Sequence, residues 1–158
     1  MTRLEQELER EARIDEQARR ASALTSALLI CACGSISASF HQAIQHSVCH
    51  CQGCRCMSGG MFSQTILVDK SNISVYQGEV AKSSFTATNM GEIDKYTCSK
   101  CTSPLWYEQK GKVGAARVFV GAIKDQRWLD DNTPMEEVWH MNRCTWLPEL
   151  AGIRLARR

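Results

Sequence analysis

The chain has 158 residues, of which 44% are hydrophobic and 23% are charged, and its formal net charge is +2. This length and composition exclude a wholly disordered protein and favour one globular domain. The longest apolar run, residues 27–33, is far shorter than the roughly 18 residues that cross a bilayer, so we expect no membrane partner. The small net charge argues against a nucleic-acid partner.

The first predicted element is a helix over residues 3–22, which contain no Gly or Pro and are rich in Glu, Gln, Arg, Ala and Leu. Opposite charges lie four residues apart in three pairs: Glu9 and Arg13, Asp15 and Arg19, Glu16 and Arg20. Two interpretations are open: a solvated helix beside the domain, or an arm that forms a homodimer or covers a site. These residues also lack the apolar centre of a signal peptide, which predicts a cytoplasmic protein.

From residue 24 onward the sequence predicts short strands separated by turns. The predicted strands are rich in β-branched and aromatic residues and lie in residues 28–40, 61–69, 73–78, 83–88, 93–98, 104–109 and 116–123. Lys110, Gly111 and Gly114 predict a hairpin between the last two of them. Residues 134–150 predict a final strand or a short helical turn. We expect a mainly β fold of antiparallel sheets over residues 24–158, with a helical extension over residues 1–23.

Nine cysteines are the unusual feature of the composition. Eight of them lie in three clusters, within residues 31–33, 49–56 and 98–101, and Cys144 stands alone. In a reducing compartment, clustered cysteines bind metal or carry out chemistry more often than they form disulfides. The alternatives are a redox pair, which lacks its usual βαβ context here, an iron–sulfur cluster, or disulfides in an exported protein.

Zinc is the metal that these thiols favour, because Zn²⁺ binds four soft thiolates tetrahedrally. Cys98 and Cys101 form a C-x-x-C pair and supply half of such a set. Cys31 and Cys33 can supply the other half, because alternation at the end of a strand places both side chains on one face. We therefore expect these four cysteines to form a closed structural zinc site.

The middle cluster predicts a different kind of zinc site. Cys49, Cys51 and Cys54 offer three thiolates within six residues. Three protein ligands and one open position are typical of a catalytic zinc. Cys56 either joins as a fourth ligand and closes the site or points away from it, and the sequence leaves both possibilities open.

Two residues of this cluster are candidates for catalysis. His50 lies between two expected ligands and is the nearest candidate for acid–base catalysis. Its alternative is an ordinary side chain that faces solvent. Arg55 is a candidate to bind a substrate carboxylate with two hydrogen bonds, and its alternative is a surface salt bridge.

The three clusters also carry sequence motifs of a known family. The motifs are Cys31-Ala32-Cys33-Gly34, Cys49-His50-Cys51-Gln52-Gly53-Cys54-Arg55 and Cys98-Ser99-Lys100-Cys101-Thr102-Ser103-Pro104-Leu105. Together they resemble the glutathione-dependent formaldehyde-activating enzyme family, which includes centromere protein V, over about residues 28–146. The chain departs from the family pattern in its N-terminal extension, in Cys56, and in Thr102, where Gly is more common.

The resemblance implies a β-tent-type fold with two zinc ions. It implies a structural zinc at Cys31, Cys33, Cys98 and Cys101, and a second zinc at Cys49, Cys51 and Cys54, where the thiol substrate binds. The family activity is carbon–sulfur lyase chemistry, the reversible condensation of formaldehyde with glutathione.

Three hypotheses for function stay open. The first is a zinc-dependent lyase that joins a thiol such as glutathione to an aldehyde. The second is a glutathione-independent zinc enzyme for a larger carbonyl metabolite, acting by decarboxylation, elimination or isomerisation, with a deep aromatic pocket at the second zinc. The third is a non-enzymatic, zinc-stabilised binding module, with Cys56 closing the second zinc site and no pocket beside it.

Overall fold

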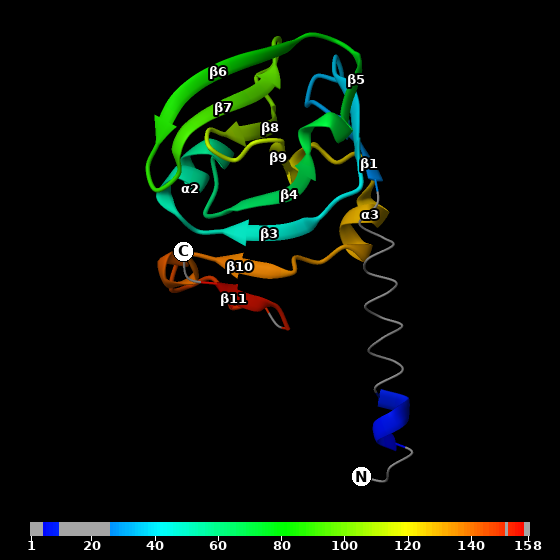
Figure 1. The fold of residues 1–158 in the computed structure, drawn as a ribbon, viewed down its shortest axis with the longest axis vertical. Coiled ribbons are helices and arrows are strands. Elements are labelled where there is room, and N and C mark those ends of the chain that lie inside the picture. Colours follow the sequence, from blue (N-terminus) through cyan, green and yellow to red (C-terminus); the bar gives the residue numbers. More distant parts are fainter. Residues whose placement is uncertain (1–4, 10–25, 151, 157–158) are drawn as a thin grey trace.

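A computed structural model describes residues 5–9, 26–150 and 152–156 (Figure 1). The described residues form two sheets, which confirms the prediction of a mainly β fold. Residues 5–9 are helical. The remainder of the helix predicted over residues 3–22 lies outside the described residues. No helix in the described part of the chain combines the length and the apolar character needed to span a membrane.

The smaller sheet has the strand order β1-β2-β5, formed by Ser26–Ile30, Ser37–His41 and Ile73–Gln77. The larger sheet has the order β11-β10-β3-β4-β9-β8-β7-β6. Its strands are, in chain order, β3 (Gln45–Cys49), β4 (Ser63–Asp69), β6 (Val80–Ala87), β7 (Gly91–Cys98), β8 (Pro104–Gln109), β9 (Ala115–Phe119), β10 (Glu136–Val138) and β11 (Arg154–Ala156).

Helical segments connect several of these strands. The helices are α2 (Gln52–Ser58) and α3 (Gln126–Asp131), and the 3-10 turns are η1 (Lys70–Asn72), η2 (Val120–Ala122) and η3 (His140–Asn142). Neither α2 nor α3 was predicted from the sequence, because segments of seven and six residues are too short to show a helical period.

The main core lies between the two sheets. Side chains alternate along each strand, so Ile66 and Val68 of β4 point to the same face of the larger sheet as Val118 of β9. They pack with Leu29 and Phe40 of the smaller sheet, and all five are fully buried. This burial fixes the register of the central strands, because a shift by one residue would turn the apolar set to the opposite face.

The opposite face of the larger sheet curves around α2. Figure 1 shows β6 and β7 arching past this helix, and Met57 of α2 packs with Ile93 of β7 and Phe119 of β9. Gly53 allows the helix to approach the β6–β7 turn closely. A Cβ atom at this position would lie 2.3 Å from the carbonyl oxygen of Thr88, so every residue other than glycine would clash here.

The sheet is mixed, which corrects the expectation of purely antiparallel strands. β10 pairs in parallel with both β3 and β11. A long connection through η2 and α3 precedes β10, and such a crossover allows a strand to enter the sheet in the parallel sense. The predicted hairpin between β8 and β9 is confirmed, with Gly111 at φ 85° and Gly114 at φ 77°.

The first predicted strand segment, residues 28–40, is also interrupted. β1 ends at Ile30, and β2 begins at Ser37. A turn lies between them, closed by a hydrogen bond from the Gly34 N–H to the Cys31 carbonyl oxygen at 3.0 Å. Gly34 has φ 74°, which glycine adopts without steric strain. Cys31 and Cys33 therefore lie in a turn and not on one face of a strand.

Candidate metal centres and cavity

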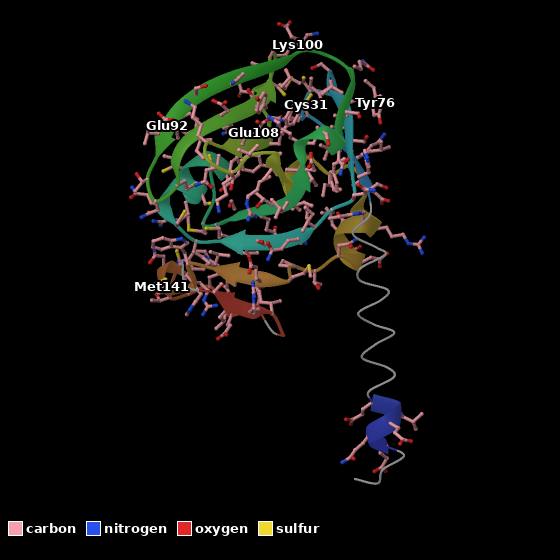
Figure 2. The ribbon with its side chains drawn as sticks, in the orientation of Figure 1. Cys31, Tyr76, Glu92, Lys100, Glu108 and Met141 are labelled. Carbon is pink, nitrogen blue, oxygen red and sulfur yellow. The ribbon has the colours of Figure 1, made fainter. Side chains whose placement is uncertain are left out.

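The cysteines of the first and third clusters meet at one point. The Sγ atoms of Cys31, Cys33, Cys98 and Cys101 all lie within 4.8 Å of one another. The first two come from the β1–β2 turn, Cys98 ends β7, and Cys101 lies in the turn before β8. Figure 2 shows Cys31 at the same end of the molecule as Lys100, the residue before Cys101. We refer to these residues as the four-cysteine group.

Two local features shape the turn that carries Cys101. The Thr102 N–H donates to the Cys98 carbonyl oxygen at 3.0 Å, and Thr102 has φ 59°. A positive φ explains why glycine would suit this position. Cys98 is fully buried in the main core, so the four-cysteine group is continuous with the packing between the sheets.

Polar hydrogens point at the sulfur atoms of this group. Burial raises the pKa of the Cys31 thiol, but hydrogen bonds from the Ile36 N–H and from Ser35 outweigh it, and the pKa falls to about 7. Hydrogen bonds from Ser103, whose hydroxyl lies 3.1 Å from the Cys101 Sγ atom, lower the pKa of that thiol to about 5. These hydrogen bonds favour the thiolate, the form that binds zinc, at Cys31 and Cys101, whereas the pKa of Cys33 is raised.

The second group is local in sequence. Cys49 ends β3, Cys51 is the N-cap of α2, and Cys54 lies in its first turn. Their Sγ atoms also lie within 4.8 Å of one another. The Cys54 N–H donates to the Cys51 Sγ atom at 3.3 Å, so the start of the helix fixes the spacing of the two thiols. We refer to these residues as the three-cysteine group.

Hydrogen bonding among the thiols of the three-cysteine group favours a thiolate at Cys51. Hydrogen bonds from Cys49 and Cys54, together with backbone N–H groups, lower the pKa of Cys51 to about 3 despite its burial. The hydrogen bond to Cys51 raises the pKa of Cys49. Full deprotonation therefore requires a cation. The donor set fits a soft divalent ion such as zinc, which displaces thiol protons on binding.

All nine cysteines lie within the described residues, and all are free thiols. Cys56 is exposed and does not belong to the three-cysteine group. The reason is helical geometry, because residues two apart on α2 point in nearly opposite directions. Cys144 is half-buried, and its Sγ atom lies 3.6 Å from the Met61 sulfur.

His50 lies in the protein interior and not at a solvent-facing site. Its side chain is fully buried, and its Nε2 atom lies 2.6 Å from the Glu137 Oε1 atom. Glu137 also accepts two hydrogen bonds from Arg143, at 3.0 and 2.9 Å. The backbone N–H of His50 donates to the Val138 carbonyl oxygen at 3.1 Å. These contacts attach the chain between Cys49 and Cys51 to β10.

A cavity of about 370 Å³ opens beside the three-cysteine group. It is lined by Gln45, Ser47, Cys49, Cys51, Cys54, Thr65, Leu67, Asn89, Met90, Tyr107, Gln109, Lys112, Ala115, Arg117, Val138 and Trp139. None of the four-cysteine group lines it. Neither His50 nor Arg55 lines it either, and the Arg55 Nε atom is buried with no partner among the described residues.

Tyr107 and Arg117 line the cavity, although the sequence interpretation did not select them. They are direct neighbours across β8 and β9, so their side chains stand side by side on one face. Burial raises the pKa of Tyr107, which keeps its hydroxyl protonated at neutral pH. The sequence carries one signal for Arg117, because it is the charged residue inside the otherwise apolar residues 116–123. This signal shows which side of the sheet Arg117 occupies only after the strand pairing is known.

The family model described as glutathione-dependent formaldehyde-activating enzyme matches residues 28–142, which contain both cysteine groups. A crystal structure of a Rhodobacter sphaeroides protein is similar, with 16% sequence identity, a TM-score of 0.49, and coverage of 65% of this chain and 94% of that chain. No curated protein matches the chain.

Proposed function

Because the chain belongs to the glutathione-dependent formaldehyde-activating enzyme family, we propose that it is a zinc-dependent carbon–sulfur lyase. In its reaction a thiol such as glutathione adds reversibly to an aldehyde such as formaldehyde. The sulfur–carbon bond forms as the carbonyl π bond breaks, and the carbonyl oxygen takes up the proton that the thiol loses. The site is the three-cysteine group with its cavity.

Two zinc ions have different roles in this proposal. Cys31, Cys33, Cys98 and Cys101 would hold a structural ion with a complete set of four ligands. Cys49, Cys51 and Cys54 would hold the second ion, and a bound zinc there supplies a soft Lewis acid that favours the thiolate form of a thiol substrate. Three thiolates around Zn²⁺ give a net charge of about −1, which disfavours hydroxide formation and suits exchange of soft ligands.

The chain's own residues position the reactants and stabilise developing charge. The α2 N-terminus and β3 hold the three sulfur atoms at one end of the cavity, which brings the two reactants together. The protonated Tyr107 hydroxyl can donate a hydrogen bond to the aldehyde oxygen, where negative charge develops as the new bond forms. Tyr107 therefore takes the role that the sequence suggested for His50.

One observation carries this proposal: the three-cysteine group lines the cavity, and the four-cysteine group does not. The exposed Cys56 leaves the fourth metal position to a ligand from the cavity. Both features count against a binding module with a closed second site. The predicted domain over residues 24–158 contains every residue that the proposal uses, and the extension over residues 1–23 remains a separate prediction.

A second candidate is a zinc enzyme that acts on a larger carbonyl compound without glutathione. The observation in its favour is the cavity, which at about 370 Å³ is much larger than formaldehyde requires and has Tyr107 and Trp139 in its lining. A glutathione adduct would also use this space, so the volume alone does not choose between the two substrates. Activity with glutathione distinguishes the two substrates.

The test is the exchange of ¹³C-formaldehyde with its glutathione adduct, followed by NMR on the zinc-loaded protein. We expect the wild type and Cys144→Ser to accelerate the exchange. With Cys54→Ser the exchange should run only at the uncatalysed rate. If the wild type, loaded with two zinc ions, accelerates no exchange with glutathione or with smaller thiols, the lyase proposal is wrong. Conversion of a larger carbonyl compound without thiol would then favour the second candidate.

A further inference from the structure

We propose that Arg117 forms a carboxylate-binding subsite in the cavity and selects thiol substrates that carry a carboxylate at the end remote from sulfur. The inference deepens the proposed function and rests on it for the position of the thiol. It assigns to Arg117 of β9 the recognition role that the sequence suggested for Arg55.

Strand pairing aims Arg117 into the cavity. Its register neighbours are Leu67 on β4 and Tyr107 on β8, and all three residues line the cavity. The adjacent Ala116 and Val118 point to the opposite face and are buried in the main core. Arg117 therefore cannot turn to the other side of the sheet, and its guanidinium is confined to the cavity face.

Arg117 has no acidic partner among the described residues. Its one hydrogen bond runs from Nη1 to the Thr65 Oγ1 atom, at 3.4 Å. By contrast, Arg143 and Arg154 are each paired with a buried glutamate. A half-buried guanidinium carries five N–H donors, so most of the hydrogen-bonding capacity of Arg117 is open to a ligand.

The charge of the cavity lining favours a negatively charged ligand. Arg117 and Lys112 are its two cationic residues, and the lining contains no Asp or Glu. The remaining polar groups are the thiols of the three-cysteine group at one end, hydroxyls, and the amides of Gln45, Asn89 and Gln109. A carboxylate matches the planar guanidinium with two parallel hydrogen bonds, and the partial exclusion of water strengthens such a pair.

A competing role for Arg117 is to offset the negative charge of the three thiolates. The two roles differ in what the side chain stabilises. A charge-offsetting arginine would support zinc binding and would affect every thiol ligand equally. A carboxylate-binding arginine would leave the zinc content unchanged and would separate acidic thiols from neutral ones.

The test uses isothermal titration calorimetry on the zinc-loaded protein with 3-mercaptopropionate and 3-mercaptopropionamide. We expect the wild type to bind the acid about 10- to 100-fold more tightly than the amide, as a charge-assisted pair predicts. Arg117→Gln should bind the amide as the wild type does, and should bind the acid no more than about threefold more tightly than the amide, since only Lys112 then remains as a cation. Arg117→Lys should retain part of the preference, since it keeps the charge and loses the fork.

Matched controls and a thiol-free ligand separate the possible failures. Arg127→Gln removes the same charge from an exposed position outside the cavity and should behave as the wild type. Lys112→Gln, at an exposed part of the lining, should lower the preference for the acid by about threefold. Zinc content is measured for every variant.

Three results would overturn the subsite: equal loss of acid and amide binding in Arg117→Gln, loss of zinc in that variant, or no preference for the acid in the wild type. Propionate tests the subsite independently of the thiol. If neither thiol binds but propionate shifts wild-type NMR resonances and not those of Arg117→Gln, the subsite stands and the proposed thiol chemistry fails.

Discussion

The two cysteine groups are built from the same ligand but belong to different parts of the fold. In the four-cysteine group the Sγ atoms of Cys33 and Cys98 lie 3.9 Å apart, although 65 residues separate them in the sequence. This group joins the start of the domain to the turn between β7 and β8, and it borders the main core. Metal binding there would close a long loop of the chain, which ties it to folding.

The three-cysteine group shows the opposite arrangement. Its members lie within six residues, and the end of β3 and the first turn of α2 position them. Loss of its metal would open no long loop, and its sulfur atoms face a cavity. The distance in sequence between the cysteines therefore distinguishes the two groups. The group with distant cysteines holds the fold together, and the group with neighbouring cysteines is free to exchange a bound ligand.

The largest expected effect is that of Cys98→Ser. Structural zinc in small domains contributes roughly 10 kcal/mol or more, which equals the whole stability of a typical domain. We expect this variant to be unfolded at 25 °C, as measured by far-UV circular dichroism and by loss of NMR dispersion. A cooperatively folded Cys98→Ser protein that melts near the wild type would remove the distinction between the two groups.

Cys54→Ser should have a smaller effect on the fold and a complete effect on activity. We expect it to retain one zinc per chain where the wild type has two, because only the three-cysteine group loses a ligand. The secondary structure should be preserved, and thermal unfolding should remain cooperative. Metal analysis and circular dichroism on the same sample check both points, and the loss of both zinc ions on this substitution would contradict the independence of the groups.

The contrast between the groups was largely readable from the sequence. Cysteine spacing indicated which thiols meet, and the clusters of turn residues indicated most strands, because both signals are local. β3 was not predicted, since His46 and Ser47 are polar and are buried only in the assembled sheet. The parallel pairing of β10 was not predicted for the same reason, because it depends on the path of the connection before it.

The residues around the cysteines were less predictable than the cysteines themselves. Adjacency in sequence favoured His50 and Arg55 as catalytic residues, but His50 contacts Glu137 in the interior, Arg55 lies on α2, and neither lines the cavity. Tyr107 and Arg117 reach it from strands more than 50 residues away from the cluster. Such long-range placement follows from sheet order, which no local pattern contains.

Glu137→Gln should weaken one group and leave the other intact. The substitution removes the charge that His50 and Arg143 share inside the protein, and breaking a buried ionic network destabilises a protein by about 3 kcal/mol. His50 lies between Cys49 and Cys51. The zinc affinity of the three-cysteine group should therefore fall about 10-fold or more, as it does when other residues that orient metal ligands are changed. Urea unfolding and competition with a chromophoric chelator measure the two effects.

The matched control is Glu136→Gln, on the same strand. Glu136 is also buried, accepts a hydrogen bond from Ser47 and pairs with Arg154, so a loss of stability with an unchanged zinc affinity is expected. Equal effects of the two substitutions on zinc affinity would show that Glu137 acts through general stability and not through the chain that carries Cys49 and Cys51.

The smallest expected effect is that of Cys56→Ser. This thiol is exposed on α2 and lies outside the three-cysteine group, so the zinc content should stay at two per chain and the stability should change by less than about 0.5 kcal/mol. Metal analysis and thermal unfolding check both values. A drop to one zinc would mean that Cys56 closes the second site after all.

The most direct measurement of the difference between the groups is a stepwise removal of zinc from the wild-type protein by a chelator, with zinc release and far-UV circular dichroism recorded together. The first zinc should leave with the circular dichroism spectrum unchanged and with loss of activity, and the second should leave only as the protein unfolds. Simultaneous loss of both zinc ions and of the fold, or removal of both without unfolding, would contradict the separation into one structural and one exchangeable site.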